Sequence, residues 1–358
     1  MRHLTRLAAV LAAGALIITI PGAASAAPDD RSAGWLSRQL TDGLVHNTQY
    51  DFDDYGLTAD TAYALDAIGG HGGDLDDIGA ALAAKVESWT TGVDFGSSDV
   101  YAGSVAKAVV VAQVTGASAR DFGGVNLVQR LNDRVSESSP VVGRLEDRSS
   151  TDYANTIGQA FAARGLARAG SGEADEAVRF LLKQQCQAGF FRLNFAAKDV
   201  PKQGCDAGNA ADSSPDTDVT ALAVLQLDAL PKKAKTKAVR GAIVDATAWL
   251  KQAQKKNGSL GGGTATKASN ANSTGLAAWA LGETGSCGKA SKAAQWVKAL
   301  QVSGDVSGTP LAGEKGAIAY DRAAYAAAEQ DGIDTASQDQ WRRATTQAAP
   351  GLRYLACG

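Results

Sequence analysis

The feature that most constrains this chain is an alternation of two kinds of helical segment along its length. One kind has apolar residues at i, i+3 and i+4 on one side only, whereas the other is small and apolar all round, with a polar residue near its start. A helix that is apolar all round is buried, and an amphipathic helix covers the outside of a core. The amphipathic kind is predicted over 34–44, 75–89, 125–135, 174–187, 239–254 and 291–301, and the buried kind over 57–68, 101–114, 153–166, 219–230, 273–281 and 320–328. The alternation therefore predicts six outer helices, each followed by an inner one.

The composition agrees with closely packed helices rather than with sheet. Aromatic residues make up only 6% of the 358 residues, the chain is rich in Ala, and β-branched runs are few. A formal net charge of −3 gives no basic footprint, so we expect no nucleic-acid partner. The length allows a sizeable core, and we expect one domain over 27–358 and a monomer.

The first 26 residues have the pattern of a secretory signal peptide. Arg2 and Arg6 precede an apolar stretch over 7–20, and Ala24-Ser25-Ala26 supplies a small-x-small cleavage site. The stretch is shorter than the roughly 20 residues that a spanning helix needs, and no later segment could cross a membrane. We therefore predict residues 1–26 as a removed signal and the mature protein as secreted and extracellular.

The four cysteines take their meaning from this predicted export. They are Cys186, Cys205, Cys287 and Cys357, an even number in an oxidising compartment, and no Cys-x-x-Cys pair is present. Three pairings are open, of which we favour Cys186–Cys205, closing one loop, and Cys287–Cys357, tying the chain end to a late helix. Structural disulfides are expected, and no metal site is.

Two strings recur at the ends of the predicted helices. Buried segments open with Asp60-Thr61-Ala62, Asp218-Val219-Thr220 and Asn272-Ser273-Thr274, where Asp, Asn and Ser can cap free N–H groups. Amphipathic segments close with Gln-x-x-x-Gly, at Gln39 to Gly43, Gln185 to Gly189 and Gln254 to Gly258. Gly ends a helix in the left-handed region, and a Gln one turn earlier can bond to backbone groups of the next loop.

Together these strings resemble the terpenoid cyclase and protein prenyltransferase superfamily of α/α toroids. In that family a Gln-x-x-x-Gly-x-Trp turn closes an outer helix, and an Asp-Thr-Ala-like start opens the inner one. Here the Trp is replaced, and Leu44, Phe190 and Ser259 stand after the glycines. The segment 186–227 looks like exported bacterial proteins that carry the prenyltransferase and squalene oxidase repeat. The resemblance implies an all-α fold, an (α/α)6 toroid of six helical hairpins in a single domain.

The resemblance implies catalysis by a general acid, which requires a particular pattern of carboxyl residues. Class II terpene cyclases protonate an isoprenoid with the middle acid of Asp-x-Asp-Asp-Thr-Ala, which must be held protonated in an apolar cavity. Residues 51–54 read Asp-Phe-Asp-Asp but lack the Thr-Ala that follows in the motif, and the inner helix is expected to begin later, at Asp60. Residues 216–221 keep the Thr-Ala but lose the second acid of the pair. The candidate acids are therefore Asp53, Asp54 and Asp218, each in an incomplete motif. A solvated acidic loop is the plain alternative for 51–54, and the few aromatic residues weigh against a cation-handling cavity.

Other chemistries of toroid proteins fit less well. The zinc of protein prenyltransferases needs Asp, Cys and His, but the chain beyond residue 26 has only His46 and His71, the latter in a Gly-rich turn. Cobalamin carriers of the transcobalamin type have similar inner-helix starts, but their second, β-rich domain has no counterpart here. Polysaccharide lyases use a Tyr beside His, Arg or Asn, a role open to Tyr101, Tyr153 or Tyr320.

We therefore predict an exported, non-catalytic binding protein with a central funnel, which takes a small molecule or an extracellular protein and needs no cofactor. An enzyme of the superfamily, either a terpene cyclase-like lyase or isomerase or a polysaccharide lyase, and a cobalamin-type carrier are the alternatives. The ligand is expected where the inner helices begin, because helix N-termini present N–H groups and positive dipole ends. The predicted lining residues are Asp60, Tyr101, Tyr153, Asn155, Asp218, Asn272 and Tyr320, with Asp53 and Asp54 on the rim.

Overall fold

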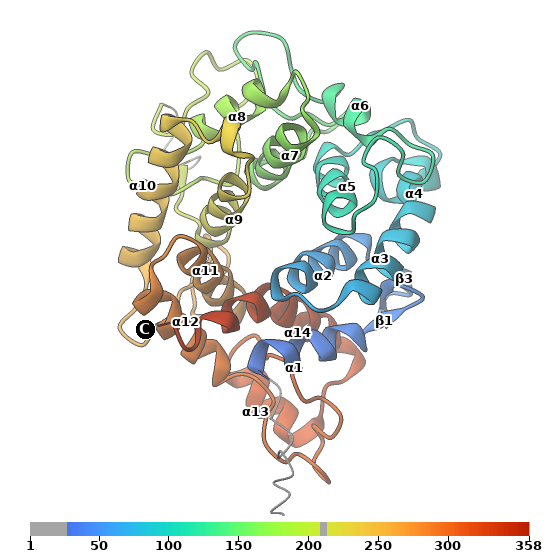
Figure 1. Ribbon diagram of the computed structural model, residues 1–358, viewed down its shortest axis with the longest axis vertical. Helices are drawn as coiled ribbons and strands as arrows, with labels where there is room; N and C mark the ends of the chain where they lie inside the picture. Colours follow the sequence, from blue (N-terminus) through green and yellow to red (C-terminus); the bar gives the residue numbers. More distant parts are fainter. Residues whose placement is uncertain (1–26, 208–212, 358) are drawn as a thin grey trace, which may run out of the picture.

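The computed structural model describes residues 27–207 and 213–357, and it is mostly helical (Figure 1). Six helices lie around a central axis: α2 (Tyr55–Ile68), α5 (Ala102–Val114), α7 (Thr156–Ala169), α9 (Thr217–Asp228), α11 (Ala271–Glu283) and α14 (Thr335–Ala348), which continues into the 3-10 helix η4 (Ala349–Tyr354). Each of these inner helices packs against the next, and α14 packs against α2, so the ring closes. The predicted signal peptide, residues 1–26, lies outside the described residues.

A second set of helices lies outside this ring (Figure 1): α1 (Pro28–Ser37), α3 (Gly72–Ala84), α4 (Val86–Thr90), α6 (Leu127–Asn132), α8 (Ala174–Lys183), α10 (Lys237–Ala253) and α12 (Cys287–Lys298). The outer helices bury one face, as α8 does through Ala174, Ala177, Val178 and Leu181, at helical spacing. The inner helix α5, in contrast, buries most of its length. Helices α8 and α5 therefore have the amphipathic and the buried character that the sequence predicts for them.

The predicted helix over 34–44 is wrong beyond Ser37, because the chain there turns into a small antiparallel sheet. Its strands are β1 (Leu40–Thr41), β2 (Leu44–Asn47) and β3 (Phe52–Asp53), in that order. Asp42 and Gly43 both have positive φ and form the β1–β2 turn. The chain is therefore not purely α.

Three more helices differ from the sequence prediction. The predicted segment 125–135 is helical only in α6, where Asn126 accepts a hydrogen bond from Gln129 N and caps the helix. Helix α2 begins at Tyr55 rather than at Asp60, because the side chain of Asp54 caps it at Leu57 N. The predicted inner helix 320–328 is α13 (Arg322–Asp331), which buries only Ala328, and α14 occupies the sixth inner place instead. The sequence of α14 is polar, so it was not predicted as an inner helix.

The turns between outer and inner helices lie at the end of the ring where the inner helices begin, here called the N-terminal end. Gln254 Nε2 donates to the carbonyl oxygens of Gly258, in its own turn, at 3.0 Å and of Lys289, on the next outer helix, at 2.9 Å. Gln185 does the same with Gly189 and Ala242. The predicted bonding of these glutamines to the following loop is therefore confirmed, and it also ties neighbouring outer helices together.

A threonine of the inner helix fixes each of several loops that precede it. The hydroxyl oxygens of Thr58, Thr220, Thr274 and Thr345 accept hydrogen bonds from the backbone N–H groups of Val45, Phe191, Leu260 and Ile318, at 2.8 to 3.0 Å. The recurrence of this bond at Thr345 supports the place of α14 in the ring.

The first and last parts of the chain join directly. Gln301 Nε2 donates to Pro28 O at 2.6 Å and to Ser32 Oγ at 2.7 Å, both on or beside α1. Arg342 of α14 donates to Gln39 Oε1 and His46 O. These bonds close the outer set of helices across the two ends of the chain.

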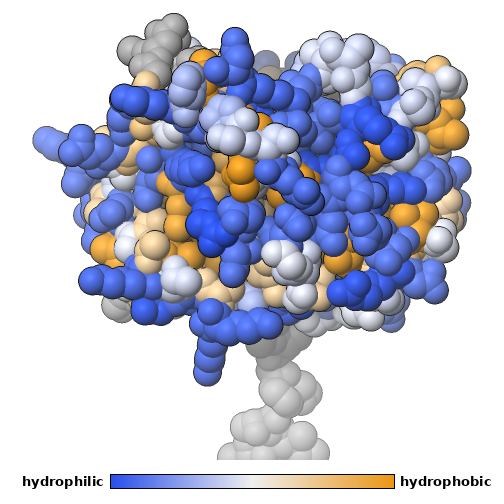
Figure 2. Space-filling view, turned by 90° about the horizontal axis from the view of Figure 1, so that it is seen from above, coloured by the Kyte–Doolittle hydropathy of each residue, from blue (hydrophilic) through white to orange (hydrophobic). Residues whose placement is uncertain are grey.

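Both disulfides form as the sequence analysis favoured, Cys186 with Cys205 and Cys287 with Cys357. The second joins the start of α12 to the segment that follows η4. The edge of the molecule seen in Figure 2 is mainly hydrophilic, with small and scattered apolar patches. Within the described ranges, no helix combines the length and the apolar character that crossing a membrane requires.

Candidate functional site: the central cavity

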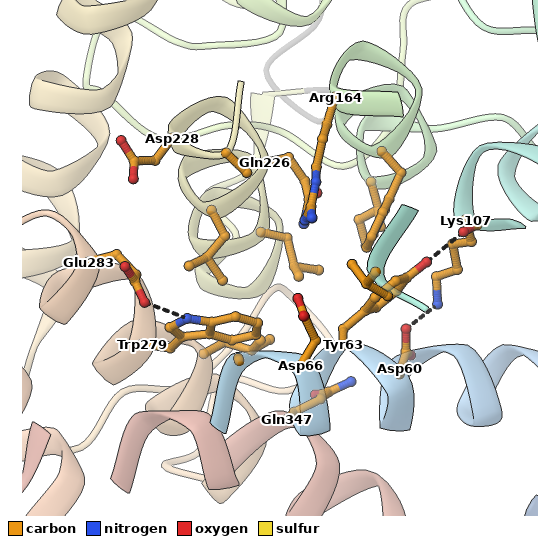
Figure 3. Close-up of a pocket in the computed structure, with 18 of the residues that line it drawn as sticks. Asp60, Tyr63, Asp66, Lys107, Arg164, Gln226, Asp228, Trp279, Glu283 and Gln347 are labelled. Carbon is orange, nitrogen blue, oxygen red and sulfur yellow. Dashed lines mark hydrogen bonds and ion pairs between the residues drawn. The ribbon is translucent and has the colours of Figure 1, made fainter. Parts of the chain in front are cut away.

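A cavity of about 350 Å³ lies at the axis of the ring, and every inner helix contributes to its wall (Figure 3). It runs from the middle of the inner helices toward their last residues, which we call the C-terminal end of the ring. The lining residues are Asp60, Tyr63, Asp66, Ala67, Lys107, Val114, Ile157, Phe161, Arg164, Leu222, Leu225, Gln226, Asp228, Ala229, Leu276, Trp279, Glu283, Thr346 and Gln347. Its size and mixed lining suit a small organic molecule.

Aromatic side chains form part of the wall and are held in place. The rings of Tyr63 and Phe161 stack with their centroids 5.1 Å apart, and Tyr63 donates its hydroxyl proton to Lys107 O at 2.7 Å. Trp279 Nε1 donates to Glu283 Oε1 at 3.3 Å. These bonds fix the polar ends of the aromatic groups and leave their apolar parts to face the cavity.

Most acids of the cavity have a cationic partner. Asp60 pairs with Lys107 at 2.6 Å, Asp228 with Lys235 at 2.8 Å, and Glu283 with Arg353 at 3.4 Å. The partners of Asp228 and Glu283 do not line the cavity, so these two carboxylates are paired with cations that lie outside it.

Arg164 is held differently. Its Nη1 donates to Gln226 Oε1 at 3.2 Å, and its buried Nε has no hydrogen-bond partner within the described residues. Burial lowers the pKa of Arg164, and Arg168 lowers it further, whereas Tyr63 and Asp66 act in the opposite direction. Burial raises the pKa of Asp66, which the charges of Arg164 and Arg168 partly offset. The guanidinium therefore stands in the cavity without a direct counter-ion.

Asp218 has the most perturbed carboxyl group at the N-terminal end of the ring. Burial raises its pKa to about 6, the nearby hydroxyl of Ser273 acts against this rise, and the charge of Asp216 adds to it. Its Oδ1 is buried without a hydrogen bond among the described residues. Leu222, one turn further along α9, lines the cavity, but Asp218 itself does not.

The structure brings three of the predicted site residues together, Asp218, Asn272 and Tyr320. Tyr320 O accepts a hydrogen bond from Ala271 N at 2.7 Å, and the charge of Asp218 contributes to the raised pKa of Tyr320, after burial. Asn272 lines a second, shallower hollow with Tyr320, and its Nδ2 donates to Gln347 Oε1 at 2.9 Å. Since Gln347 lines the central cavity, this amide pair connects the two spaces.

The remaining predicted lining residues lie apart from this group. Asp60 lines the cavity. Asn155 caps α7 by accepting from Ile157 N and Gly158 N, and Tyr101 precedes the first residue of α5. Tyr153 is 75% exposed. Their roles in ligand binding stay predictions.

The acids of the 51–54 loop all have protein partners. His46 Nδ1 lies 3.0 Å from Asp53 Oδ1, and His46 Nε2 lies 3.4 Å from Asp51 Oδ1. Asp54 caps α2 and pairs with Arg343. Among the described residues, the side chains close enough together to hold a metal ion are those of Cys186, Cys205 and Asp206. The two cysteines are joined in a disulfide, so they offer no thiolate to a metal.

Sequence reasoning missed the residues that shape the cavity, above all Tyr63, Phe161, Arg164 and Trp279. A usable signal was present, because charged or large aromatic residues inside otherwise small and apolar helices must face something other than a neighbouring helix. Arg164 in Phe161-Ala162-Ala163-Arg164 is the clearest case.

Comparison with known proteins adds information about the fold only. No family model and no curated protein matches this sequence. A protein from Actinoplanes has a TM-score of 0.58 at 16% identity over 92% of this chain and 98% of its own. The type II terpene cyclase MstE from Scytonema has a TM-score of 0.61 at 13% identity over 92% and 98%. An unsaturated glucuronyl hydrolase from Bacillus sp. GL1 reaches 0.59 at 9% identity over 92% and 95%.

At these identities the likeness covers the arrangement of helices and not the chemistry of the site. The enzymes carry different reactions on a similar frame. The closed ring of inner helices, its outer layer and these matches together show that the chain has an α/α toroid fold.

Proposed function

We propose that this protein is an exported binding protein, a single-domain toroid of six helical hairpins that holds a small organic molecule in its central cavity without transforming it. The observation that carries the proposal is the cavity at the ring axis, with fixed aromatic walls and a few polar groups. Preformed cavities of a few hundred Å³ with such linings are typical of small-molecule sites.

The placement of two acids, Asp218 and Asp60, favours binding over catalysis. A general acid must reach the atom that it protonates, but Asp218, the carboxyl with a pKa near 6, does not line the cavity. Asp60, which does line it, pairs with Lys107 at 2.6 Å. An ion-paired carboxylate is a poor proton donor, because the adjacent cation favours its charged form.

Export is supported by the cysteine chemistry. All four cysteines form disulfides, and no free thiol remains in the described residues. Stable disulfides are typical of secreted proteins and rare in the cytosol.

Native mass spectrometry of the protein purified from its own culture medium tests the proposal. We expect a second species that is heavier than the mature chain by the mass of one bound molecule. A matched pair of variants locates the ligand. Ala67→Trp places a large side chain in the cavity and is expected to abolish the heavier species, whereas Ala268→Trp, on an exposed loop, retains it. A bare mass for the wild type under gentle conditions would contradict the proposal.

Acid catalysis on an isoprenoid is the second candidate, because the buried, unpartnered Oδ1 of Asp218 resembles that of a carboxyl kept protonated. This candidate requires that Asp218 gains access to the cavity past Leu222. Incubation with linear isoprenoids and analysis by gas chromatography–mass spectrometry tests it. A cyclised product from the wild type that is lost in Asp218→Asn favours the enzyme, and unchanged substrate with both proteins removes it.

A further inference from the structure

Among the described residues that line the cavity, Arg164 is the cation without an ion pair, and Asp66 is the unpaired acid. It projects from the middle of α7 toward the cavity centre, beside Gln226 and across from Asp66 (Figure 3). Its one hydrogen bond in the described residues goes from Nη1 to Gln226 Oε1, at 3.2 Å. No described carboxylate oxygen lies within 4.0 Å of its nitrogen atoms.

A guanidinium in this position is costly to the folded protein. Removal of a cation from water without a compensating anion is unfavourable, and the pKa of Arg164 is lowered mainly by this desolvation. A surface position would avoid the cost. The position of Arg164 is better explained if an anionic group of a bound ligand pairs with its guanidinium.

Asp66 does not fully supply this anion. It belongs to α2 on the other side of the cavity and is exposed, and the charges of both Arg164 and Arg168 act on it. No ion pair joins Asp66 to either arginine in the described residues, so its charge acts on Arg164 only at longer range. Arg168, on the next turn of α7, is exposed to solvent, whereas Arg164 is half-buried and has no anion in direct contact.

The geometry points to a ligand with a carboxylate that pairs with Arg164, while its apolar body lies against Tyr63, Phe161 and Trp279. The planar guanidinium matches a carboxylate in shape and charge. Gln226 accepts from Arg164 through Oε1, which leaves its Nε2 group as a second donor to the same carboxylate. This inference rests on the proposed binding function and adds the chemical class of the ligand.

An organic cation is the competing class. The inner helices end near this part of the cavity, and helix C-termini favour positive charge. However, the carboxylates of Asp60, Asp228 and Glu283 are already engaged by Lys107, Lys235 and Arg353. Asp66, the lining carboxylate without an ion pair, is exposed to solvent, which screens its charge.

Isothermal titration calorimetry with three probes that share one body separates these classes. The probes are 1-naphthoate, 1-naphthalenemethanol and 1-naphthylmethylammonium, titrated into the full mature chain. Wild type, Arg164→Met, Arg164→Lys and the outer-surface control Arg179→Met are compared. We expect the wild type to bind the carboxylate at least about tenfold more tightly than the alcohol, as a charge-assisted hydrogen bond gives.

Arg164→Met is expected to remove this preference, and binding of the alcohol by this variant shows that it is folded. Arg164→Lys should keep part of the preference, because it keeps the charge but not the planar fork. Arg179→Met should behave as the wild type.

The two failures are distinguishable. Tighter binding of the ammonium, equal binding of carboxylate and alcohol, or a preference that survives in Arg164→Met would overturn the carboxylate inference and leave cavity binding intact. Absence of binding for all three probes would count against the proposed function and, with it, against the ligand class.

Discussion

The two ends of the ring are built from the same six inner helices but in different ways. At the N-terminal end, threonine hydroxyls, capping side chains and glutamines satisfy backbone groups, and glycines let outer helices approach the turns. At the C-terminal end the helices surround an open cavity with aromatic walls and an unpaired guanidinium. The comparison teaches that the sequence motifs which repeat most clearly hold the ring together, whereas the residues that differ between repeats shape the site.

The largest expected effect on stability comes from replacing a turn glycine, and it should differ between the N-terminal and the C-terminal end of the ring. Gly258 has φ of +93°, and a Cβ on it would meet the backbone of Lys292 on the next outer helix. Gly285, in the turn after α11, has φ of +75° with open space around it. We expect Gly258→Ala to lower the free energy of unfolding by about 3 kcal/mol and Gly285→Ala by about 1 kcal/mol. Urea denaturation followed by circular dichroism measures both, and equal losses would argue against a tighter N-terminal end.

The next effect is the pH dependence of stability that Asp218 causes. Its pKa is raised from 3.8 to about 6 by burial, so the folded protein binds this proton more tightly than the unfolded chain does. Stability from this group is therefore complete below pH 4 and falls as the pH rises through 6. Asp218→Asn should abolish that fall and gain at most about 3 kcal/mol at pH 8.

Thermal or urea unfolding of Asp218→Asn and the wild type between pH 4 and 8 measures this difference. Asp228→Asn, at the other end of α9, serves as the control and should show no such gain, because Asp228 is ion-paired with Lys235. A constant difference between Asp218→Asn and the wild type across this pH range would refute the assignment.

The smallest expected effect tests the cavity itself. If Arg164 is kept for binding, its replacement by an apolar side chain should not harm the empty protein. We expect Arg164→Met to raise the free energy of unfolding by about 1 kcal/mol or less, because it removes a half-buried charge that has no direct counter-ion. A loss of more than about 1 kcal/mol would instead make Arg164 a structural residue.

Much of the fold could be predicted because its signals are local. Helical periodicity, capping residues and Gln-x-x-x-Gly turns each act over a few positions, and they gave the alternating helices and the turn bonds. The sixth inner helix was missed because α14 is polar in sequence, although Trp341, Arg342 and Thr345 are buried in contacts with distant segments. The Ala-rich α13 was mistaken for it, since Ala favours helix whether or not it is buried.

The site was harder to predict because it depends on which faces meet at the axis. The sequence predicts Asp60 at the start of an inner helix, whereas in the structure it lies within α2 and lines the cavity from there. Tyr63 and Phe161 lie far apart in sequence, and their stacking follows from the packing of the ring. No single segment carries that information.

The bond between Gln301 and Pro28 has a consequence for the order of folding. These residues are 273 positions apart, so helix α1 meets its partner only after most of the chain has been synthesised. Contacts this distant in sequence form late, because the chain between them must be ordered first. Until then the ring is an open arc with two unprotected edges, and the last sixty residues decide when the cavity comes into existence.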